Sequence, residues 1–280
     1  MHTIVSILAR LAVLLLACPV FAYAGLPQAS NVPGGVAIVP LVSMSASRDK
    51  PEASFGGQSV LVAQDRDMWV AVVGLSLDVT PGVQTLLGKI GGDTKVAEFV
   101  VNDKQYPEQH IELKDKSKVQ LSPANLARAE REIALIKKLK RRWHAAQDTD
   151  LNFILPARGE LAGRFGLHRF FNGEPRAPHA GLDVAVARGT PVNASARGEV
   201  LATGNYFFNG KTIFLDHGNG LITMYCHLDR IDVKVGKSVR KGQRIGLSGE
   251  TGRATGPHLH WSVVLNGAMV DPELFIAPVN

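Results

Sequence analysis

Cysteine is scarce in this chain, with only Cys18 and Cys226 among 280 residues. Cys18 falls within a leader segment that we expect to be cleaved, which would leave Cys226 without a partner in the mature chain. The sequence therefore excludes a disulfide scaffold, in which cross-links replace a core that is too small. A chain of this length with 45% hydrophobic residues can bury a sizeable core without cross-links.

Apolar runs long enough to span a bilayer are also absent. The run at residues 11–17 follows Arg10 and is too short to cross. With the Ala-Tyr-Ala pattern at residues 22–24, it predicts a secretory signal peptide, residues 1–24, cleaved after Ala24. The mature protein is then expected to be periplasmic or secreted, with no transmembrane segment. One alternative stays open, because the Leu-Leu-Ala-Cys stretch ending at Cys18 loosely resembles a lipoprotein processing site.

Neither charge nor aromatic content is extreme. The chain has 31 Lys and Arg against 25 Asp and Glu, and removing Arg10 with the leader leaves 30 against 25, a net charge of +5. Aromatic residues make up 6% of the chain and do not form the stacked pattern typical of nucleic-acid grooves. We therefore expect no nucleic-acid partner, and the mild positive surplus suits an anionic polymer outside the cell.

The first half of the mature chain is rich in β-branched residues. Gly, Pro and Asp separate the runs at residues 36–42, 69–79 and 97–101, which predict strands. No chemical motif occurs there. Residues 25–121 are therefore predicted to form a β-rich N-terminal domain with a regulatory or targeting role.

A single helix is predicted next, with Ser122 as its cap and Pro123 at its first position. Basic residues crowd its far end, and we interpret them as a solvated face. The helix and a linker at residues 147–152 make up residues 122–152. The expected apolar stripe comprises Leu126, Ala129, Ile133, Ile136, Leu139 and Trp143.

From residue 153 onward, helical periodicity is nearly absent. Short strands alternate with glycine turns, as in GEVLATG and TIFLDHGNG. Residues 153–280 are therefore predicted to form an all-β domain, and the chain as a whole is predicted to be mainly β.

The stretch TGPHLHWSV places His258 and His260 two residues apart after a Gly-Pro pair. Pro disfavours a helix there, and residues two apart on a strand share a face. His258, His260 and Ser262 should therefore point to one side. The intervening Leu259, Trp261 and Val263 should point into apolar packing.

A second element, HAGLDVAV, places His179 four residues before Asp183. Gly181 and the run Val-Ala-Val argue against a helix, so His179 is expected at a turn and Asp183 near the start of a strand. Zinc accepts imidazole and carboxylate ligands, and a catalytic site uses three protein ligands. His179, Asp183 and one histidine of the His-x-His pair would supply that set, although Asp183 could also be an ordinary turn cap.

The third element is the stretch YCHL, which contains His227 at the end of a β-branched run. Strand alternation should turn Cys226 away from the face of His227, as a buried and inert thiol. His168 and His217 occur in turn-like contexts without a partner motif, and we interpret them as structural.

In this order, the three elements resemble one family, the lysostaphin-type (LytM-type) zinc endopeptidases that cleave peptide cross-links of bacterial peptidoglycan. The resemblance covers roughly residues 155–272 and includes RFGLHRFFNG, PHAGLD, ARGTPV, GNGLITMYCHL and VGKSVRKGQRIGLSGETGRATGPHLHW. It implies a C-terminal antiparallel β-sheet catalytic domain. It also implies one zinc ion held by His179, Asp183 and His260, with catalytic roles for His227 and His258.

The implied function is a secreted zinc endopeptidase, a hydrolase that acts on peptidoglycan peptide stems through metal-activated water. Which of His227 and His258 takes the proton stays open. Relatives that keep the fold but lose ligands activate other wall hydrolases, so a non-enzymatic activator or a wall-binding regulator is the alternative. The complete set of five residues argues against it.

Two further expectations concern departures and regulation. Many family members carry Glu where this chain has Ser262, which could tune metal affinity.

Residues 25–150 are expected to restrain the enzyme by supplying a ligand to the open zinc position, with Asn102, Glu108 and His110 as loop-like candidates. A passive spacer or a wall-targeting module is the alternative.

Overall fold

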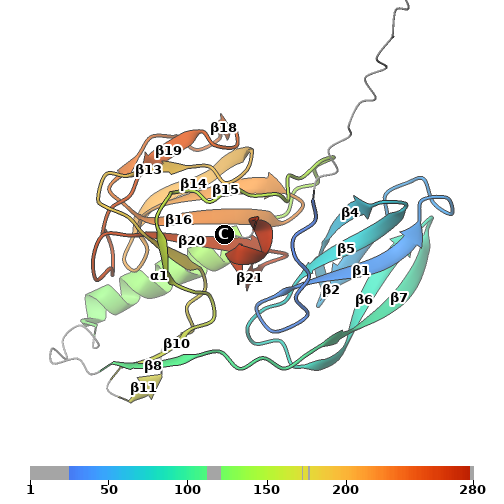
Figure 1. Ribbon diagram of the computed structural model, residues 1–280, viewed down its shortest axis with the longest axis horizontal. Coiled ribbons are helices and arrows are strands. Elements are labelled where there is room, and N and C mark those ends of the chain that lie inside the picture. The colour runs from blue at the N-terminus through green and yellow to red at the C-terminus, as the bar shows by residue number, and fades with distance from the viewer. Residues whose placement is uncertain (1–24, 112–120, 172, 176, 278–280) are drawn as a thin grey trace, which may run out of the picture.

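The computed structural model describes residues 25–111, 121–171, 173–175 and 177–277. The expected signal peptide, residues 1–24, lies outside the described residues. The described part is mainly β, with antiparallel sheets and one α-helix (Figure 1), as the sequence predicts. No helix within these ranges is long and apolar enough to cross a membrane.

Two small sheets form the N-terminal part. The three predicted strand runs are found there as β1 (Val36–Ser43), β5 (Met68–Gly74) and β7 (Asp93–Val101). The last five residues of β5 are all buried, whereas β7 is buried only at Val101. One sheet has the order β1 (Val36–Ser43), β5 (Met68–Gly74) and β4 (Leu61–Asp65). The other has the order β3 (Gln58–Ser59), β2 (Glu52–Phe55), β6 (Gly82–Ile90) and β7 (Asp93–Val101).

An eight-stranded antiparallel sheet dominates the C-terminal part. Its inner face carries Trp261 and Tyr225, which are fully buried together with Leu259 and Val263. The strand order is β18 (Ser238–Val239), β14 (Gly198–Tyr206), β15 (Gly210–Gly218), β16 (Leu221–Leu228), β20 (Leu259–Leu265), β12 (Leu182–Ala185) and β9 (Glu160–Gly163), with β21 (Ala268–Val270) paired to β20. A short 3-10 helix, η2 (Pro272–Phe275), follows.

Two three-stranded sheets complete the molecule. One has the order β13 (Pro191–Asn193), β19 (Arg244–Leu247) and β17 (Arg230–Ile231). The other has the order β11 (Glu174–Pro175), β10 (His168–Phe171) and β8 (Glu108–Ile111). The β8–β10 pair is parallel. The sequence suggested that residues 108–111 lie in a loop, but they form a strand that pairs with the C-terminal part of the chain.

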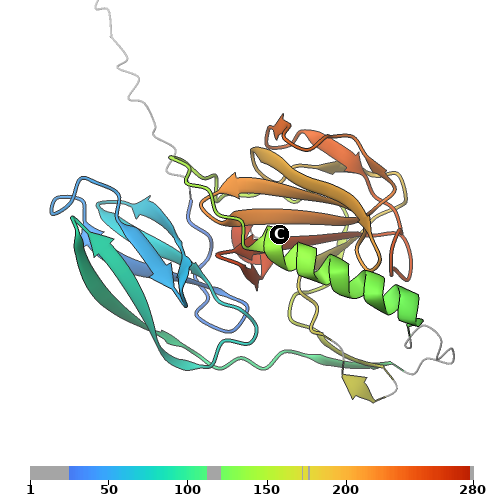
Figure 2. The same cartoon turned by 180° about the vertical axis from the view of Figure 1, so that it is seen from behind.

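The helix α1 (Pro123–Lys140) starts as predicted, because the backbone N–H of Asn125 donates to Oγ of Ser122 at 3.3 Å. Its apolar stripe is less buried than predicted. Ala129 is buried, and Ile136 and Leu139 pack on the sheet, but the exposed fractions of Leu126 and Ile133 are 48% and 54%. Trp143 lies beyond the end of the helix. The helix therefore covers the sheet with one narrow edge (Figure 2).

The N-terminal and C-terminal parts share contacts and a core. Val36, Leu61 and Val72 belong to the same buried cluster as Trp261. The side-chain amide of Asn266 bonds the backbone of β5 at Gly74, with its Oδ1 accepting from the backbone N–H at 2.6 Å and its Nδ2 donating to the carbonyl at 3.0 Å. Backbone bonds also join Gln28 to Leu274 and Asp271 to Gly34, both at 2.8 Å. The parts of the chain before and after the predicted boundary near residue 121 therefore pack against each other.

Candidate metal and catalytic site

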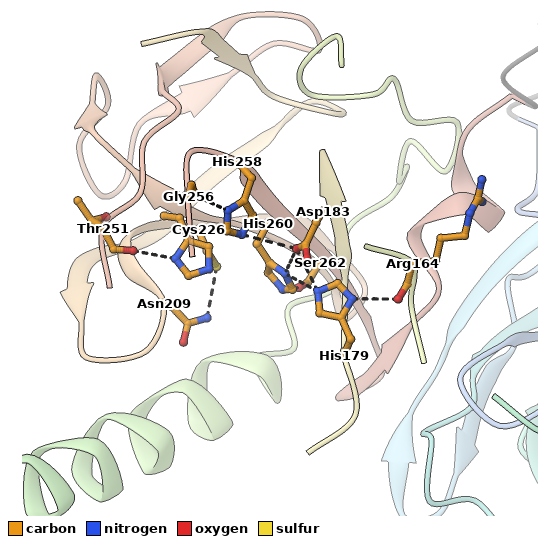
Figure 3. A network of polar contacts seen from close by, with 11 residues as sticks. Arg164, His179, Asp183, Asn209, Cys226, Thr251, Gly256, His258, His260 and Ser262 are labelled. Carbon is orange, nitrogen blue, oxygen red and sulfur yellow. Dashed lines mark hydrogen bonds and ion pairs between the residues drawn. The ribbon is translucent and has the colours of Figure 1, made fainter. Parts of the chain in front are cut away.

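Two adjacent strands and one loop bring His179, Asp183 and His260 together. Asp183 on β12 lies directly opposite His260 on β20, and His179 lies in the irregular segment that precedes β12. Asp183 Oδ1 lies 3.0 Å from His179 Nε2 and 2.8 Å from His260 Nδ1, and these two nitrogens are 3.0 Å apart (Figure 3). The three residues form a group whose ligand atoms could hold one metal ion.

The outer nitrogens of the two imidazoles fix which atoms face inward. His179 Nδ1 donates to the carbonyl of Arg164 at 3.0 Å, because a carbonyl can only accept. His260 Nε2 lies 2.9 Å from Oγ of the fully buried Ser262, a hydroxyl that can accept the Nε2 proton. With Ser262 as the acceptor, Nε2 of His179 and Nδ1 of His260 both present lone pairs, as in metal-binding histidines.

The donor set fits a divalent cation. Two imidazole nitrogens and one carboxylate oxygen face one another at distances of 2.8 to 3.0 Å, and these are ligand types that zinc accepts in proteins. Burial alone would raise the pKa of Asp183, but the adjacent His179 and His260 outweigh burial, and the pKa lies well below its ordinary value. The Asp183 carboxylate is therefore ionised and available as a ligand.

His258 stands beside this group with one nitrogen anchored. It immediately precedes β20, and its Nδ1 donates to the carbonyl of Gly256 at 2.8 Å. Its Nε2 lies 3.9 Å from Asp183 Oδ1. The free lone pair of His258 therefore points toward the candidate metal group and not into the core.

His227 completes the cluster from β16. Its Nδ1 donates to the carbonyl of Thr251 at 2.8 Å, and its ring centroid lies 4.7 Å from that of His258. The φ angle of His227 is 60°, in the left-handed region that non-glycine residues rarely adopt. Such strain is typical of functional positions, and here it accompanies a side chain turned toward the other histidines.

Burial keeps two of these imidazoles neutral at neutral pH. It lowers the pKa of His227 to about 4, although the hydrogen bond to Thr251 opposes the change. Burial also lowers the pKa of His260, against the attraction of Asp183. Neutral imidazoles are required both for metal ligands and for proton acceptors.

The predicted orientation of Cys226 is wrong. In the antiparallel β16–β20 pair, Cys226 lies directly opposite His260, and opposite residues share a face. The left-handed conformation of His227 interrupts strand alternation, so both side chains lie on the side of the site. The prediction of a buried thiol holds, because Cys226 is fully buried and burial raises its pKa to about 11.

Two glycines make room for the ligands, and the sequence analysis did not assign them this role. A Cβ atom at Gly181 would lie 2.6 Å from Nε2 of His260. A Cβ atom at Gly163 would collide with the carboxylate of Asp183. Gly181 stands inside the PHAGLD motif, so the sequence could have pointed to it. Its role in making room for His260 becomes visible only when the position of β20 is known.

His217 and His168, which the sequence analysis interpreted as structural and placed in turn-like contexts, lie in strands. His217 on β15 donates from Nδ1 to the Arg197 carbonyl at 2.7 Å and bonds Thr223 through Nε2 at 2.8 Å. His168 on β10 stacks on Tyr106, with ring centroids 6.5 Å apart. The N-terminal candidates Asn102, Glu108 and His110 do not belong to the metal-binding group, and Glu108 and His110 lie on β8.

Comparison with known proteins agrees with this arrangement. The Peptidase family M23 profile matches residues 177–272, which contain all five residues of the site. The Peptidase family M23 N-terminal domain profile matches residues 29–104.

Curated relatives match about a third of this chain. Peptidoglycan DD-endopeptidase ShyA of Vibrio cholerae is 50% identical over 95 residues, which are 34% of this chain and 22% of that protein. DD-carboxypeptidase/endopeptidase Mpg of Neisseria meningitidis is 44% identical over 100 residues, 36% of this chain and 23% of that protein. This chain therefore spans less than a quarter of the length of these relatives.

A solved structure matches nearly from end to end. A crystal structure of a peptidase M23 from Pseudomonas aeruginosa is 40% identical with a TM-score of 0.73, and the match covers 88% of this chain and 95% of that chain. Because both the sequence and the fold agree over almost the whole length of that protein, this chain belongs to peptidase family M23.

Proposed function

We propose that this protein is a zinc-dependent endopeptidase that hydrolyses peptide cross-links of bacterial peptidoglycan. The observation that carries the proposal is the convergence of His179, Asp183 and His260, flanked by His227 and His258. Backbone carbonyls accept from Nδ1 of His179, His227 and His258, which leaves the Nε2 lone pair of each available.

In this proposal His179, Asp183 and His260 hold one zinc ion, since two imidazoles and a carboxylate leave a position open for water or substrate. Zinc, when bound, supplies a Lewis acid that lowers the pKa of water and polarises the scissile carbonyl. The Arg164 carbonyl and the Ser262 hydroxyl orient the two imidazoles from outside.

The two other histidines act on the attacking water and on the substrate. Nε2 of His258 is nearest to the ligand group and accepts the proton of the attacking water, because its Nδ1 proton is fixed on the Gly256 carbonyl. The protonated His258 then returns that proton to the leaving amine. Nε2 of His227, anchored by Thr251, faces the same space and contacts the substrate at the reacting amide.

The substrate class rests on the relatives and on the leader. Two curated relatives act as peptidoglycan DD-endopeptidase or DD-carboxypeptidase/endopeptidase by name, which supports cleavage between D-amino acids of the stem peptides. A leader with a cleavage pattern supports action outside the cytoplasm, in the periplasm or as a secreted enzyme. The complete set of five residues speaks against a purely regulatory protein.

The test compares five single variants for zinc content and for hydrolysis of a purified cross-linked muropeptide dimer. His179→Ala, Asp183→Ala and His260→Ala should lose zinc and activity. His227→Ala and His258→Ala should keep zinc and lose about 100-fold or more in kcat. A zinc-free His258→Ala protein, or a zinc-loaded wild type without any hydrolysis of the dimer, would contradict the proposal.

We also propose that residues 25–150 narrow access to the site through β8. This strand pairs with β10, and Leu167, next to β10, accepts the backbone N–H of His179 at 3.0 Å. Tyr106 ties β8 to the N-terminal part, because its hydroxyl donates to the Pro33 carbonyl at 2.7 Å. Tyr106→Ala should raise kcat/KM on a small soluble dimer, with zinc content unchanged. If a folded, zinc-loaded Tyr106→Ala variant has the same kcat/KM as the wild type, the N-terminal part acts only as a spacer or a targeting module.

A further inference from the structure

A cavity of about 420 Å³ lies between α1 and the sheet face that carries the site. From the catalytic part it is lined by His260, Ser262 and Met224. From the helix it is lined by Lys137 and Lys140, with Arg141 just beyond the helix end. The cavity therefore joins a candidate metal ligand to a set of cations on a separate element.

These cations lack acidic partners in the described ranges of the chain. The ion pairs of those ranges include none made by Lys137, Lys140 or Arg141. Burial lowers the pKa of Lys140, and the positive charge of Lys137 lowers it further, with no carboxylate opposing either effect. Lys140 is half-buried and Lys137 is exposed, and their two neighbouring ammonium groups repel each other unless an anion joins them.

The helix is held in a fixed place against the catalytic part. Oε2 of Glu132 accepts the backbone N–H of Phe207 at 2.5 Å, and Arg128 donates to the Asn205 carbonyl at 2.9 Å. Ala129 is buried between these contacts, and Ile136 packs on the sheet. Figure 2 shows α1 lying along the sheet of the C-terminal part. The lysines one and two turns later on this docked helix line the cavity.

We propose that α1 forms a substrate-binding wall, in which Lys137 and Lys140 bind a carboxylate of the peptide whose cross-link is cut. The inference rests on the proposed function, since it takes peptidoglycan stem peptides as the substrate. Stem peptides carry free carboxylates near the cross-link, and ammonium–carboxylate hydrogen bonds orient a peptide without touching the reacting amide. This interpretation replaces that of a merely solvated basic face.

The experiment compares a cross-linked muropeptide dimer with the same dimer whose carboxylates have been converted to carboxamides. Lys137→Gln/Lys140→Gln should raise KM for the acidic dimer by about tenfold and leave kcat unchanged. For the amidated dimer, the wild type should already show the raised KM. The double Gln variant should not raise the KM for this dimer any further. Lys138→Gln is the matched control, because Lys138 is exposed on the same helix and does not line the cavity.

Charge, and not size, should decide the effect. Lys137→Arg/Lys140→Arg should keep the wild-type KM, and thermal unfolding should show that all variants are folded. A double Gln variant with unchanged KM, or one that raises KM equally for both dimers, overturns the proposal.

Failure of the proposed function is recognised separately. Binding of an uncross-linked, carboxylate-bearing stem peptide is measured by calorimetry on the wild type and on the double Gln variant. If the wild type cleaves neither dimer, the endopeptidase function fails. The binding wall still stands if the peptide binds about tenfold more weakly to the double variant, and it falls if both proteins bind the peptide equally.

Discussion

At the scale of single residues, hydrogen bonds to oxygen atoms orient the imidazole rings of the site. Carbonyl groups of Arg164, Thr251 and Gly256 can only accept, so each fixes a proton on the ring nitrogen that faces it. Only His260 is anchored by a side chain, the hydroxyl of Ser262. Ser262 is therefore the one anchor that a substitution can remove.

Ser262→Ala should weaken metal binding by roughly 10-fold to 100-fold, because His260 loses the partner that fixes its tautomer. The measurement is the zinc dissociation constant by chelator competition. Ser262→Thr keeps a hydroxyl and should retain most of the affinity. An unchanged constant in the alanine variant would show that Ser262 does not orient His260.

Gly181→Ala should abolish stoichiometric zinc binding, because its Cβ would fall 2.6 Å from Nε2 of His260. Gly181 has no left-handed φ angle, so the loss would come from the collision and not from backbone strain. Zinc content and thermal unfolding of the purified variant check this. A folded variant with full zinc content would contradict the steric argument.

The pH dependence of stability should carry a contribution from His217. Burial lowers the pKa of His217, while the Arg197 carbonyl opposes the change. Below the unfolded pKa of about 6.5 the unfolded chain binds a proton that the native chain does not, so stability falls as pH falls, by up to about 1.4 kcal/mol per pH unit. The free energy of unfolding, measured with urea, should therefore fall more steeply between pH 7.5 and 5.5 in the wild type than in His217→Gln. Equal slopes would contradict it.

At the scale of elements, the sequence predicted what local pattern controls. Strand alternation placed Trp261 in the core and His260 opposite to it, and Ser122 with Pro123 marked the start of α1. It could not predict the left-handed φ angle of His227, which depends on contacts with a distant loop. It also missed β8, whose four residues lack alternation and gain their partner from β10.

Docking of α1 should depend on Glu132. Glu132→Gln weakens the charge-assisted bond to the backbone N–H of Phe207, at a cost of about 1 kcal/mol. Amide hydrogen exchange in α1 should then speed up by roughly fivefold, since 1 kcal/mol corresponds to that factor. Glu130→Gln, exposed on the same helix, is the control. Equal exchange in both variants would show that Glu132 does not hold the helix.

At the scale of the whole molecule, the N-terminal part contributes to the core of the catalytic part. Val36, Leu61 and Val72 are at most 1% exposed within the shared cluster. The sequence could not predict this sharing, because no periodicity specifies which of two β-rich regions covers the other.

A chain that begins at Asp150 should therefore be destabilised, on the order of 5 kcal/mol, from the loss of these three side chains. It would also expose the edge of β10 that β8 covers. Thermal unfolding and light scattering should show a lower Tm and aggregation relative to the full chain. A truncated protein with the same Tm would mean that the shared cluster adds little stability.

The two backbone bonds that join Gln28 to Leu274 and Gly34 to Asp271 also set an order in time. A chain that leaves the ribosome or crosses a membrane N-terminus first presents these early residues long before their partners. His260 and the segment that bonds the N-terminal part are close in the sequence, so they emerge together. The chain therefore gains this candidate metal ligand and the contacts that hold its N-terminal part in one step. Before that step, the candidate metal group lacks one of its three members.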